Sequence, residues 1–337
     1  MERLLNPALP VHPARAADWQ GNLFADGSFQ YEREPVRVNF GSVVRMLTTS
    51  NPQSAAKRAD RWAPPVDQDV TYLTDRSRNW IVWLGHACFL MQLNGKRFLT
   101  DPQLRDLPTI PRRVHPPFSY ADIRGVDYLL LSHDHRDHVD EKCIRTLCAN
   151  NNIKKILAPL RLSRLIGKWV GDTPIEEAAW YQRYDTGDSG VAIHFLPARH
   201  WCRRGLTDFN HHLWGSFMLE VKEGEETRTI YYGADSGTTS YWAEIAKLFP
   251  DIDVALLGIG AYRPSYMMET MHTTPAEAFA AYRTLGARYW WPMHHGTYDL
   301  SQEPASEPVL WASRLMEESG EGDRLIPAVV NRPWWMG

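Results

Sequence analysis

The sequence predicts an α/β fold in which helices cover β-sheets. Short apolar runs of strand length recur along the chain, first in close succession and then alternating with segments of helical periodicity. Polar residues stand just beyond several of these runs, at the strand ends where layered α/β proteins collect functional groups. The chain has 337 residues, 44% of them hydrophobic and 23% charged, which is enough to bury a large core.

Residues 1–75 differ in composition from the rest of the chain. They are rich in proline, arginine and polar groups and show little periodicity, which predicts an N-terminal arm that is mostly extended. Short helices are expected near residues 41–48 and 52–62. The aromatic residues of the arm indicate that it packs on the body, residues 76–337. These are Trp19, Phe24, Phe29 and Tyr31.

The first half of the body is dominated by strand patterns. Asn94-Gly95 favours a tight hairpin turn between two of the strands, and Asp101-Pro102 ends the second of them. The run 126–131 is apolar throughout, as in a strand that is buried on both faces. We expect strands at residues 80–84, 87–93, 96–100, 126–131 and 155–158, followed by a helix at residues 160–170.

The second half alternates strands with helices. Its clearest helix start is Thr274-Pro275-Ala276-Glu277, with threonine as N-cap, proline at the first position and glutamate at the third. This helix should run to Leu285 and end at Gly286, and another is expected at residues 308–319. We expect strands at residues 191–196, 217–221, 229–232, 254–259 and 289–293.

Charge and hydropathy exclude several classes of protein. The formal net charge of -3, with both signs interspersed, argues against nucleic acid as the main partner. No uncharged apolar stretch approaches the roughly 18 residues of a spanning helix, and the N-terminus does not resemble a signal peptide. Four scattered cysteines predict reduced thiols. We expect a soluble, cytoplasmic protein, with peripheral membrane contact left open.

The 14 tryptophans are the unusual feature of the composition. Most stand in or beside apolar runs, which favours packing in the core or in an interface. The alternative interpretation is an apolar groove for a lipid-like substrate. The sequence leaves both a homodimer interface and a membrane-facing groove open.

The strongest chemical signal is the run His133-Asp134-His135-Arg136-Asp137-His138. Imidazole and carboxylate suit zinc, and close spacing in a loop lets several side chains converge. The spacing does not fit one helical face, on which ligands four residues apart would be expected. The motif directly follows the buried strand at residues 126–131, which favours a metal site over a solvated turn.

Four ligands from one loop would leave each of two ions undersupplied. Three further candidates stand at the ends of later predicted strands, namely His200, Asp235 and His294. Each of them alone is more typical of a packed or surface residue. Together with the loop they make a seven-ligand set.

The order HxHxDH, then His, Asp and His, resembles the metal pattern of the metallo-β-lactamase superfamily. Within it the chain is most similar to the branch of N-acyl-phosphatidylethanolamine-hydrolysing phospholipase D. This resemblance implies an αβ/βα four-layer sandwich, in which two mixed β-sheets are flanked by helices. It extends from Trp80 to Pro304, and neither the arm nor residues 324–337 share it. The similar segments include Trp83-Leu84-Gly85-His86-Ala87, Leu99-Thr100-Asp101-Pro102, Pro197-Ala198-Arg199-His200-Trp201-Cys202, Gly233-Ala234-Asp235-Ser236-Gly237 and His294-His295-Gly296-Thr297.

The resemblance also implies roles for the ligands. It assigns one zinc ion to His133, His135 and His200. It assigns the other to Asp137, His138 and His294, with Asp235 as the bridging catalytic residue. Because His295 stands where the branch usually has tryptophan, we take His294 as the ligand.

Four other residues are candidates for supporting roles. The resemblance places His272 near the metals, as a proton donor to the leaving group or a contact for the substrate phosphate, although a plain loop histidine is an equal alternative. Asp101 could orient a ligand histidine from outside the metal shell, or it could simply form the turn before Pro102. His86 and Tyr262 complete the set as outer-shell or substrate-contacting residues.

The resemblance favours a phosphodiester of the phospholipid type as substrate. Two zinc ions about 3.5–4 Å apart can share a water and lower its pKa to about 7, and the bridging hydroxide would then attack phosphorus. Iron or manganese could occupy the same ligands. The alternatives are hydrolysis of a lactone or amide, a nucleic-acid-processing or nucleotide-binding module on the same scaffold, and a metal-stabilised binding protein without turnover.

Overall fold

The structure is a computed structural model that describes residues 1–36, 40–187 and 189–336. Within these residues the strands form a seven-stranded, a six-stranded and a small three-stranded sheet. In the seven-stranded sheet the order is β16-β4-β5-β6-β7-β8-β9, antiparallel from β16 to β6 and parallel from β6 to β9. Its strands are β4 (Trp80–Trp83), β5 (Phe89–Leu93), β6 (Lys96–Thr100), β7 (Tyr128–Leu130), β8 (Lys155–Pro159), β9 (Ile175–Ala178) and β16 (Pro333–Trp335).

The six-stranded sheet follows chain order from β10 to β15. Its first four strands are antiparallel, and its last three are parallel, so that it is also a mixed sheet. The strands are β10 (Gln182–Tyr184), β11 (Val191–Leu196), β12 (Ser216–Glu223), β13 (Glu226–Tyr232), β14 (Val254–Gly258) and β15 (Tyr289–Met293).

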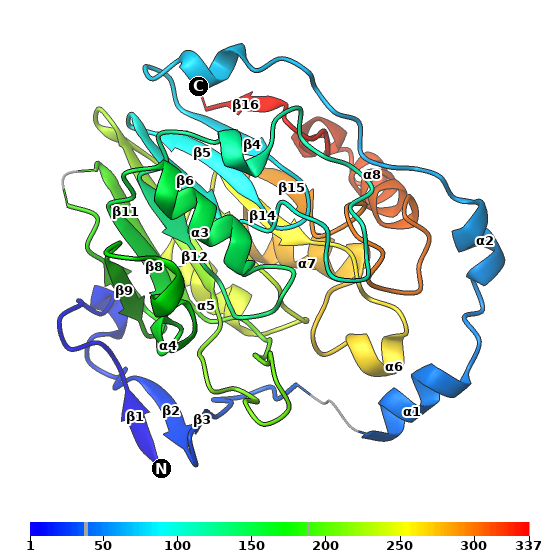
Figure 1. The fold of residues 1–337 in the computed structure, drawn as a ribbon, viewed down its shortest axis with the longest axis horizontal. Coiled ribbons are helices and arrows are strands. Elements are labelled where there is room, and N and C mark those ends of the chain that lie inside the picture. The colour runs from blue at the N-terminus through cyan, green and yellow to red at the C-terminus, as the bar shows by residue number, and fades with distance from the viewer. Residues whose placement is uncertain (37–39, 188, 337) are drawn as a thin grey trace.

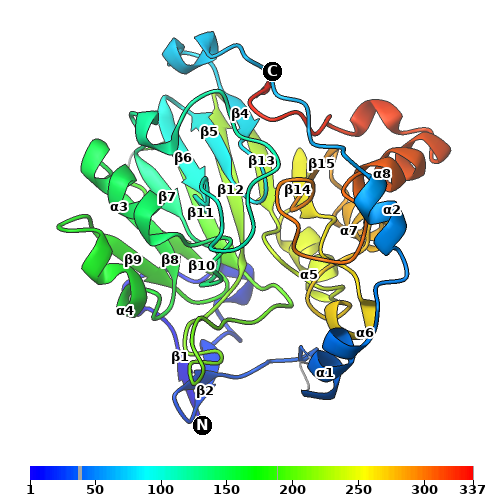
Figure 2. The ribbon, with the colours of Figure 1, turned by 45° about the vertical axis from the view of Figure 1, so that its right-hand side comes forward.

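Helices cover the outer faces of both large sheets, so that the body has four layers (Figures 1 and 2). The helices beside the seven-stranded sheet are α3 (Glu141–Asn150) and α4 (Ser163–Ile166). Those beside the six-stranded sheet are α5 (Tyr241–Leu248), α7 (Pro275–Leu285) and α8 (Glu307–Glu318). This arrangement confirms the expected αβ/βα sandwich of two mixed sheets.

The alternation of side chains along each strand builds two separate cores. On β4, Ile81 and Trp83 belong to the core between the sheets, whereas Trp80 and Val82 belong to the core under α3. Tryptophans fill much of this volume, because eight of the 14 are buried: Trp80, Trp83, Trp169, Trp180, Trp214, Trp242, Trp290 and Trp291. Most of the tryptophan content is therefore explained by packing.

Helix α7 matches its prediction from Thr274 to Gly286. The Thr274 side chain accepts from the backbone N–H of Glu277, Glu277 returns the bond, and Gly286 ends the helix in the left-handed conformation at φ 65°. The helix expected at residues 160–170 was wrong in length. It is reduced to α4 and the 3₁₀ turn η4 (Gly167–Trp169), because Arg161 has φ 70° and prevents an earlier start.

The N-terminal arm has more structure than the sequence predicts. The expected helices are present as α1 (Phe40–Thr48) and α2 (Ser54–Ala59). The three-stranded sheet of β1 (Glu2–Leu4), β2 (Asn22–Ala25) and β3 (Ser28–Phe29) was not predicted. The arm then runs along the side of the body that carries α6 (Ser265–Met268) and α8 (Figure 2). The remaining short elements are η1 (Pro13–Arg15), η2 (Thr71–Thr74), η3 (Tyr120–Asp122) and η5 (Gly322–Arg324).

Candidate metal centre

The histidine motif occupies the loop between β7 and α3. His133 and His138 are buried, His135 and Asp137 are partly exposed, and the N-cap Asp140 starts α3 directly after the loop. The Asp134 carboxylate turns away from the other side chains, because it accepts from Nδ1 of His212 at 2.8 Å and from the backbone N–H of Arg203 at 2.9 Å. Arg136 is exposed, and the four side chains of His133, His135, Asp137 and His138 are left to converge.

His133, His135 and His200 form the first group of candidate ligands. Nδ1 of His135 lies 3.0 Å from Nε2 of His133 and 3.2 Å from Nε2 of His200, which follows β11. Ligand nitrogens about 2.0–2.1 Å from a tetrahedral zinc ion stand about 3.3 Å apart. The three nitrogens therefore have nearly the separation that one ion requires.

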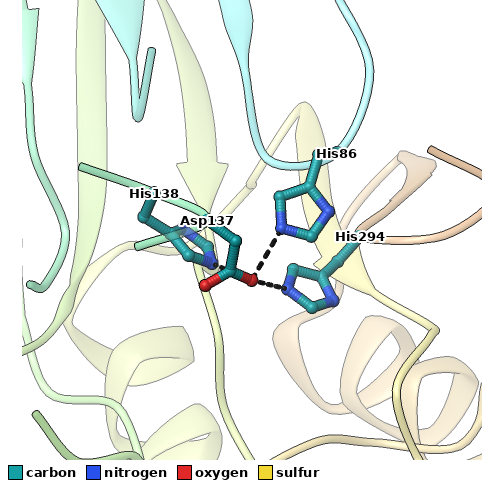
Figure 3. A group of neighbouring side chains, drawn as sticks. All are labelled: His86, Asp137, His138 and His294. Carbon is teal, nitrogen blue, oxygen red and sulfur yellow. Dashed lines mark hydrogen bonds and ion pairs between the residues drawn. The ribbon is translucent and has the colours of Figure 1, made fainter. Parts of the chain in front are cut away.

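Asp137, His138 and His294 form the second group, to which His86 is added (Figure 3). Oδ2 of Asp137 lies 3.7 Å from Nε2 of His138, 3.6 Å from Nε2 of His294 and 3.0 Å from Nε2 of His86. His294 comes from the end of β15 and His86 from the turn after β4. The group thus joins both large sheets.

Asp235 stands between the two groups, in the loop after β13. Its Oδ2 atom lies 3.2 Å from Nε2 of His138 and 3.2 Å from Nε2 of His294. The same atom lies 4.0 Å from Nε2 of His133 and 3.8 Å from Nε2 of His200. A carboxylate in this position can contact ions in both groups.

Comparison with known proteins identifies the family to which a chain with this site belongs. Residues 96–295 match the family model of the beta-lactamase superfamily domain. An N-acyl-phosphatidylethanolamine-hydrolyzing phospholipase D of Caenorhabditis elegans is 30% identical over 278 residues, which are 77% of this chain and 76% of that protein. The chain belongs to the metallo-β-lactamase superfamily. It is a metal-dependent hydrolase of that superfamily and resembles the N-acyl-phosphatidylethanolamine-hydrolysing branch.

A further relative is similar over most of the chain, and two solved structures share its fold. An uncharacterized protein of Mycobacterium tuberculosis is 30% identical over 93% of this chain and 85% of its own length. A possible metal-dependent hydrolase from Veillonella parvula superposes with a TM-score of 0.60 at 13% identity, over 77% of this chain and all of its own. An isothiocyanate hydrolase from Delia radicum gut bacteria gives 0.59 at 16% identity, over 77% of this chain and 98% of its own. At such identities the structures support the fold alone.

In this hydrolase, buried hydrogen bonds orient the ligand imidazoles from behind. Asp101 Oδ2 accepts from Nδ1 of His138 at 2.9 Å, from Ser132 Oγ at 2.5 Å and from the Tyr232 hydroxyl at 2.6 Å. Ser132 Oγ is also 2.8 Å from Nδ1 of His133. Such contacts fix the ring and direct Nε2 to a metal. Asp101 thus has the outer position suggested by its sequence, whereas Tyr232 had no local signal in the sequence.

Electrostatics favour positive charge at this centre. Burial disfavours the charged form of His138, but Asp235 and Asp137 raise its pKa well above the ordinary histidine value. Burial opposes the shift of His294 as well, yet Asp235 and Asp137 raise its pKa to about 9. Despite burial, His138 and His294 in turn hold the pKa of Asp235 well below its usual range. Bound cations would replace these protons.

The absence of hydrogen-bond partners at several candidate ligand atoms also favours a bound metal ion. Nε2 of His138, Nε2 of His294 and Oδ1 of Asp235 are buried and have no hydrogen-bond partner among the described residues. Buried polar atoms without partners are costly, and they are often accounted for by an ion. In the first group, burial lowers the pKa of His133 and His200 well below the ordinary value, which leaves neutral imidazoles, the form that binds metal.

Of the candidates for supporting roles, two histidines lie at the metal centre and Tyr262 is hydrogen-bonded elsewhere. His272 is brought to the centre, with Nδ1 3.8 Å from Oδ2 of Asp235 and its ring 5.1 Å from that of His294. His86 is also there, as described above. The Tyr262 hydroxyl donates to Glu307 at 2.6 Å, and Glu307 is not a candidate ligand. His295 is absent from all the candidate ligand groups, whereas His294 is in two of them.

No helix among the described residues is long and apolar enough to cross a membrane.

Proposed function

We propose that the protein is a binuclear zinc phosphodiesterase of the phospholipase D type, acting on N-acyl-phosphatidylethanolamine-like lipids. The observation that carries the proposal is the position of Asp235, whose Oδ2 is within 4.0 Å of ring nitrogens from both ligand groups. The relatives support the choice of substrate, since N-acyl-phosphatidylethanolamine-hydrolyzing phospholipases D of Caenorhabditis elegans and Saccharomyces cerevisiae are 30% and 29% identical to this chain. The chain spans 53% of the yeast protein.

In this proposal His133, His135 and His200 hold one ion and Asp137, His138 and His294 hold the other, with Asp235 between them. When bound, two divalent ions supply a nucleophilic water at neutral pH and neutralise charge on the phosphoryl oxygens. Asp101 and Ser132 keep the imidazoles oriented through the reaction.

His272 contacts the substrate in this proposal. Burial lowers the pKa of its imidazole to about 4, so that the ring is neutral at pH 7. A neutral ring near Asp235 suits a hydrogen bond to a phosphate oxygen or to the leaving alcohol better than full transfer of a proton. Of the two roles considered for His272, holding the phosphate is therefore favoured.

The surface beside the first ligand group supports a lipid substrate. The Trp201 ring lies 4.8 Å from the ring of His135 and 5.6 Å from that of Phe209. Phe209 is 39% exposed, and Leu206, in the same loop, is 89% exposed. An aromatic path thus leads from a ligand to exposed apolar side chains, as expected where acyl chains or a membrane surface approach. Peripheral membrane contact belongs to this proposal, and a homodimer stays a prediction.

Hydrolysis of a lactone or amide is the alternative, because the same ligands can activate water against either bond. The test is turnover of bis(p-nitrophenyl) phosphate against an acyl-homoserine lactone by the zinc-loaded protein, followed by vesicles of N-acyl-phosphatidylethanolamine. Phosphodiester turnover that exceeds lactone turnover is expected. Lactone turnover alone would reject the phospholipase D assignment and keep the metallohydrolase.

A further inference from the structure

One part of the N-terminal arm packs on the loop that follows a candidate ligand. Residues 51–64, here called the clamp, include α2 and lie outside the segment matched by the family model. They run beside residues 295–307, which directly follow His294 and lead into α8. In Figure 2 this part of the arm lies along the outside of the body next to α8.

Four polar side chains attach the clamp to this loop, those of Asn51, Gln53, Lys57 and Asp60. Asn51 Nδ2 donates to the Gln302 carbonyl at 2.8 Å, and Gln53 Nε2 donates to Glu307 at 2.6 Å. Lys57 pairs with Asp299 at 2.5 Å. The Asp60 carboxylate accepts from both the backbone N–H and the hydroxyl of Ser306, at 2.8 and 2.7 Å. Two of these bonds use backbone groups of the loop, the Gln302 carbonyl and the Ser306 N–H, so that they restrain its path as well as its side chains.

An aromatic stack continues the contact up to the residue next to the ligand. The His295 ring lies between Trp62 of the clamp, 6.0 Å away with an interplanar angle of 16°, and Trp83 of β4, 5.3 Å away at 23°. Both nitrogens of His295 are buried without a hydrogen-bond partner among the described residues.

The backbone of the ligand is restrained from both sides. Gly296 has φ 65°, and a Cβ atom there would come within 2.6 Å of the Trp62 ring and 2.9 Å of Pro64. On the side of the body, a Cβ atom on Gly260 would meet the His294 carbonyl oxygen at 2.2 Å. His294 itself has φ 58° and donates its N–H to the His86 carbonyl, which also accepts from the Trp83 indole.

We propose that the clamp positions His294, and so sets the affinity of the second ligand group for its metal ion. Trp62 is the principal positioning residue, acting through the His295 ring. The first ligand group is held by residues of the body, since Ser132 contacts His133 and the Met271 carbonyl faces Nδ1 of His200. Loss of the clamp contact should therefore affect the two ions unequally. This inference rests on the proposed two-ion site.

The test compares Trp62→Ala, Trp62→Phe and, as a control in the same arm, Trp19→Ala. Trp19 is also packed on aromatic rings, those of Trp180 and Tyr181 at 6.4 and 4.8 Å, but far along the chain from the clamp. Each metal-free protein is titrated with Zn²⁺ against a chromophoric chelator, and with Co²⁺ by visible absorption. We expect Trp62→Ala to weaken one of the two binding steps, that of the second ligand group, about tenfold or more, as changes behind a ligand typically do, and to leave the other step unchanged.

Trp62→Phe should restore the weakened step and the Co²⁺ spectrum, because it keeps an aromatic face on His295. Equal binding steps in Trp62→Ala and wild type would overturn the inference, and so would the same loss in both steps, or the same loss in Trp19→Ala. If Trp62→Ala fails to fold, the variant Asn51→Ala/Asp60→Ala is titrated with the same expectation. A wild-type protein that never binds a second ion would reject the proposed function itself, whereas failure of the inference shows only in the variants.

Discussion

Oδ2 of Asp101 lies 2.9 Å from Nδ1 of His138, on the edge of the imidazole opposite to the Nε2 atom that faces Asp235. The carboxylate is fully buried and also accepts from Ser132 and Tyr232. It therefore determines which nitrogen of His138 carries the proton and which is free for a metal ion.

Replacing Asp101 with asparagine should weaken metal binding by about 10- to 100-fold. The amide is close in size to the carboxylate but is a weaker acceptor from the imidazole N–H. Competition titration with Zn²⁺ measures the effect. Tyr232→Phe is the matched control, because it removes one of the hydrogen bonds to Asp101 without touching His138, and it should cost less. Unchanged affinity in Asp101→Asn would show that this bond does not matter to the metal.

Phenylalanine at the two adjacent histidines should have opposite effects. His294→Phe removes a candidate ligand and should abolish phosphodiester turnover. His295→Phe keeps a flat ring between Trp62 and Trp83 and removes two buried nitrogens that lack partners, each costing about 1–3 kcal/mol when unsatisfied. It should keep turnover and unfold at the same or a higher temperature. Loss of activity in His295→Phe alone would reverse the assignment of the two histidines.

The ligand set could be predicted from the sequence because its members follow apolar strands. His200, Asp235 and His294 stand after β11, β13 and β15, which are alternate strands of one sheet. These three strands run in the same direction, so that their ends lie at the same edge of the sheet. Helix α7 could be predicted because Thr274, Pro275 and Gly286 act locally.

The missed elements depend on distant contacts. Strand β16 exists because it pairs with β4, Trp335 opposite Trp80, which no pattern near the C-terminus indicates. The clamp was equally hidden, since Trp62 and His295 are far apart in sequence. The Tyr262 hydroxyl is bonded to Glu307, a contact between the loop after β14 and helix α8 that composition cannot predict.

Leu206→Glu should reduce turnover of vesicle substrates several-fold and leave turnover of bis(p-nitrophenyl) phosphate unchanged. The reason is that an exposed apolar side chain near the first ligand group helps only when the substrate is presented in a lipid surface. Leu310→Glu is the control, because Leu310 is 60% exposed but lies on α8. An equal loss on both substrates would mean that Leu206 acts on the fold or the catalytic centre instead.

Acidification should weaken the docking of the arm at His12. This ring packs edge-on against Phe249 and His194, at 5.0 and 5.6 Å, and accepts from the Ala14 N–H through Nδ1. Burial is the main reason that the pKa of His12 lies below 6.5, and the nearby His194 lowers it further. Glu220 opposes this shift. The unfolded chain therefore binds the proton more readily, and stability present above pH 6.5 is lost as the pH falls below it.

Melting temperatures of wild type and His12→Phe, measured from pH 7.5 to 5.0, isolate this contribution, because every other titrating group is common to both proteins. The wild type should lose more melting temperature on acidification than the variant. Parallel curves would show that His12 does not titrate in this range, or that its environment is the same in the unfolded chain.

The central claim, a two-ion hydrolytic centre bridged by Asp235, is tested most directly by metal content with phosphodiester turnover, in wild type and Asp235→Asn. Asparagine keeps the size of the side chain and removes the charge that both ligand groups share. We predict about two zinc ions per wild-type chain, with fewer ions and no turnover in the variant. Wild-type protein that takes up no metal on reconstitution, or full activity in Asp235→Asn, would contradict this centre.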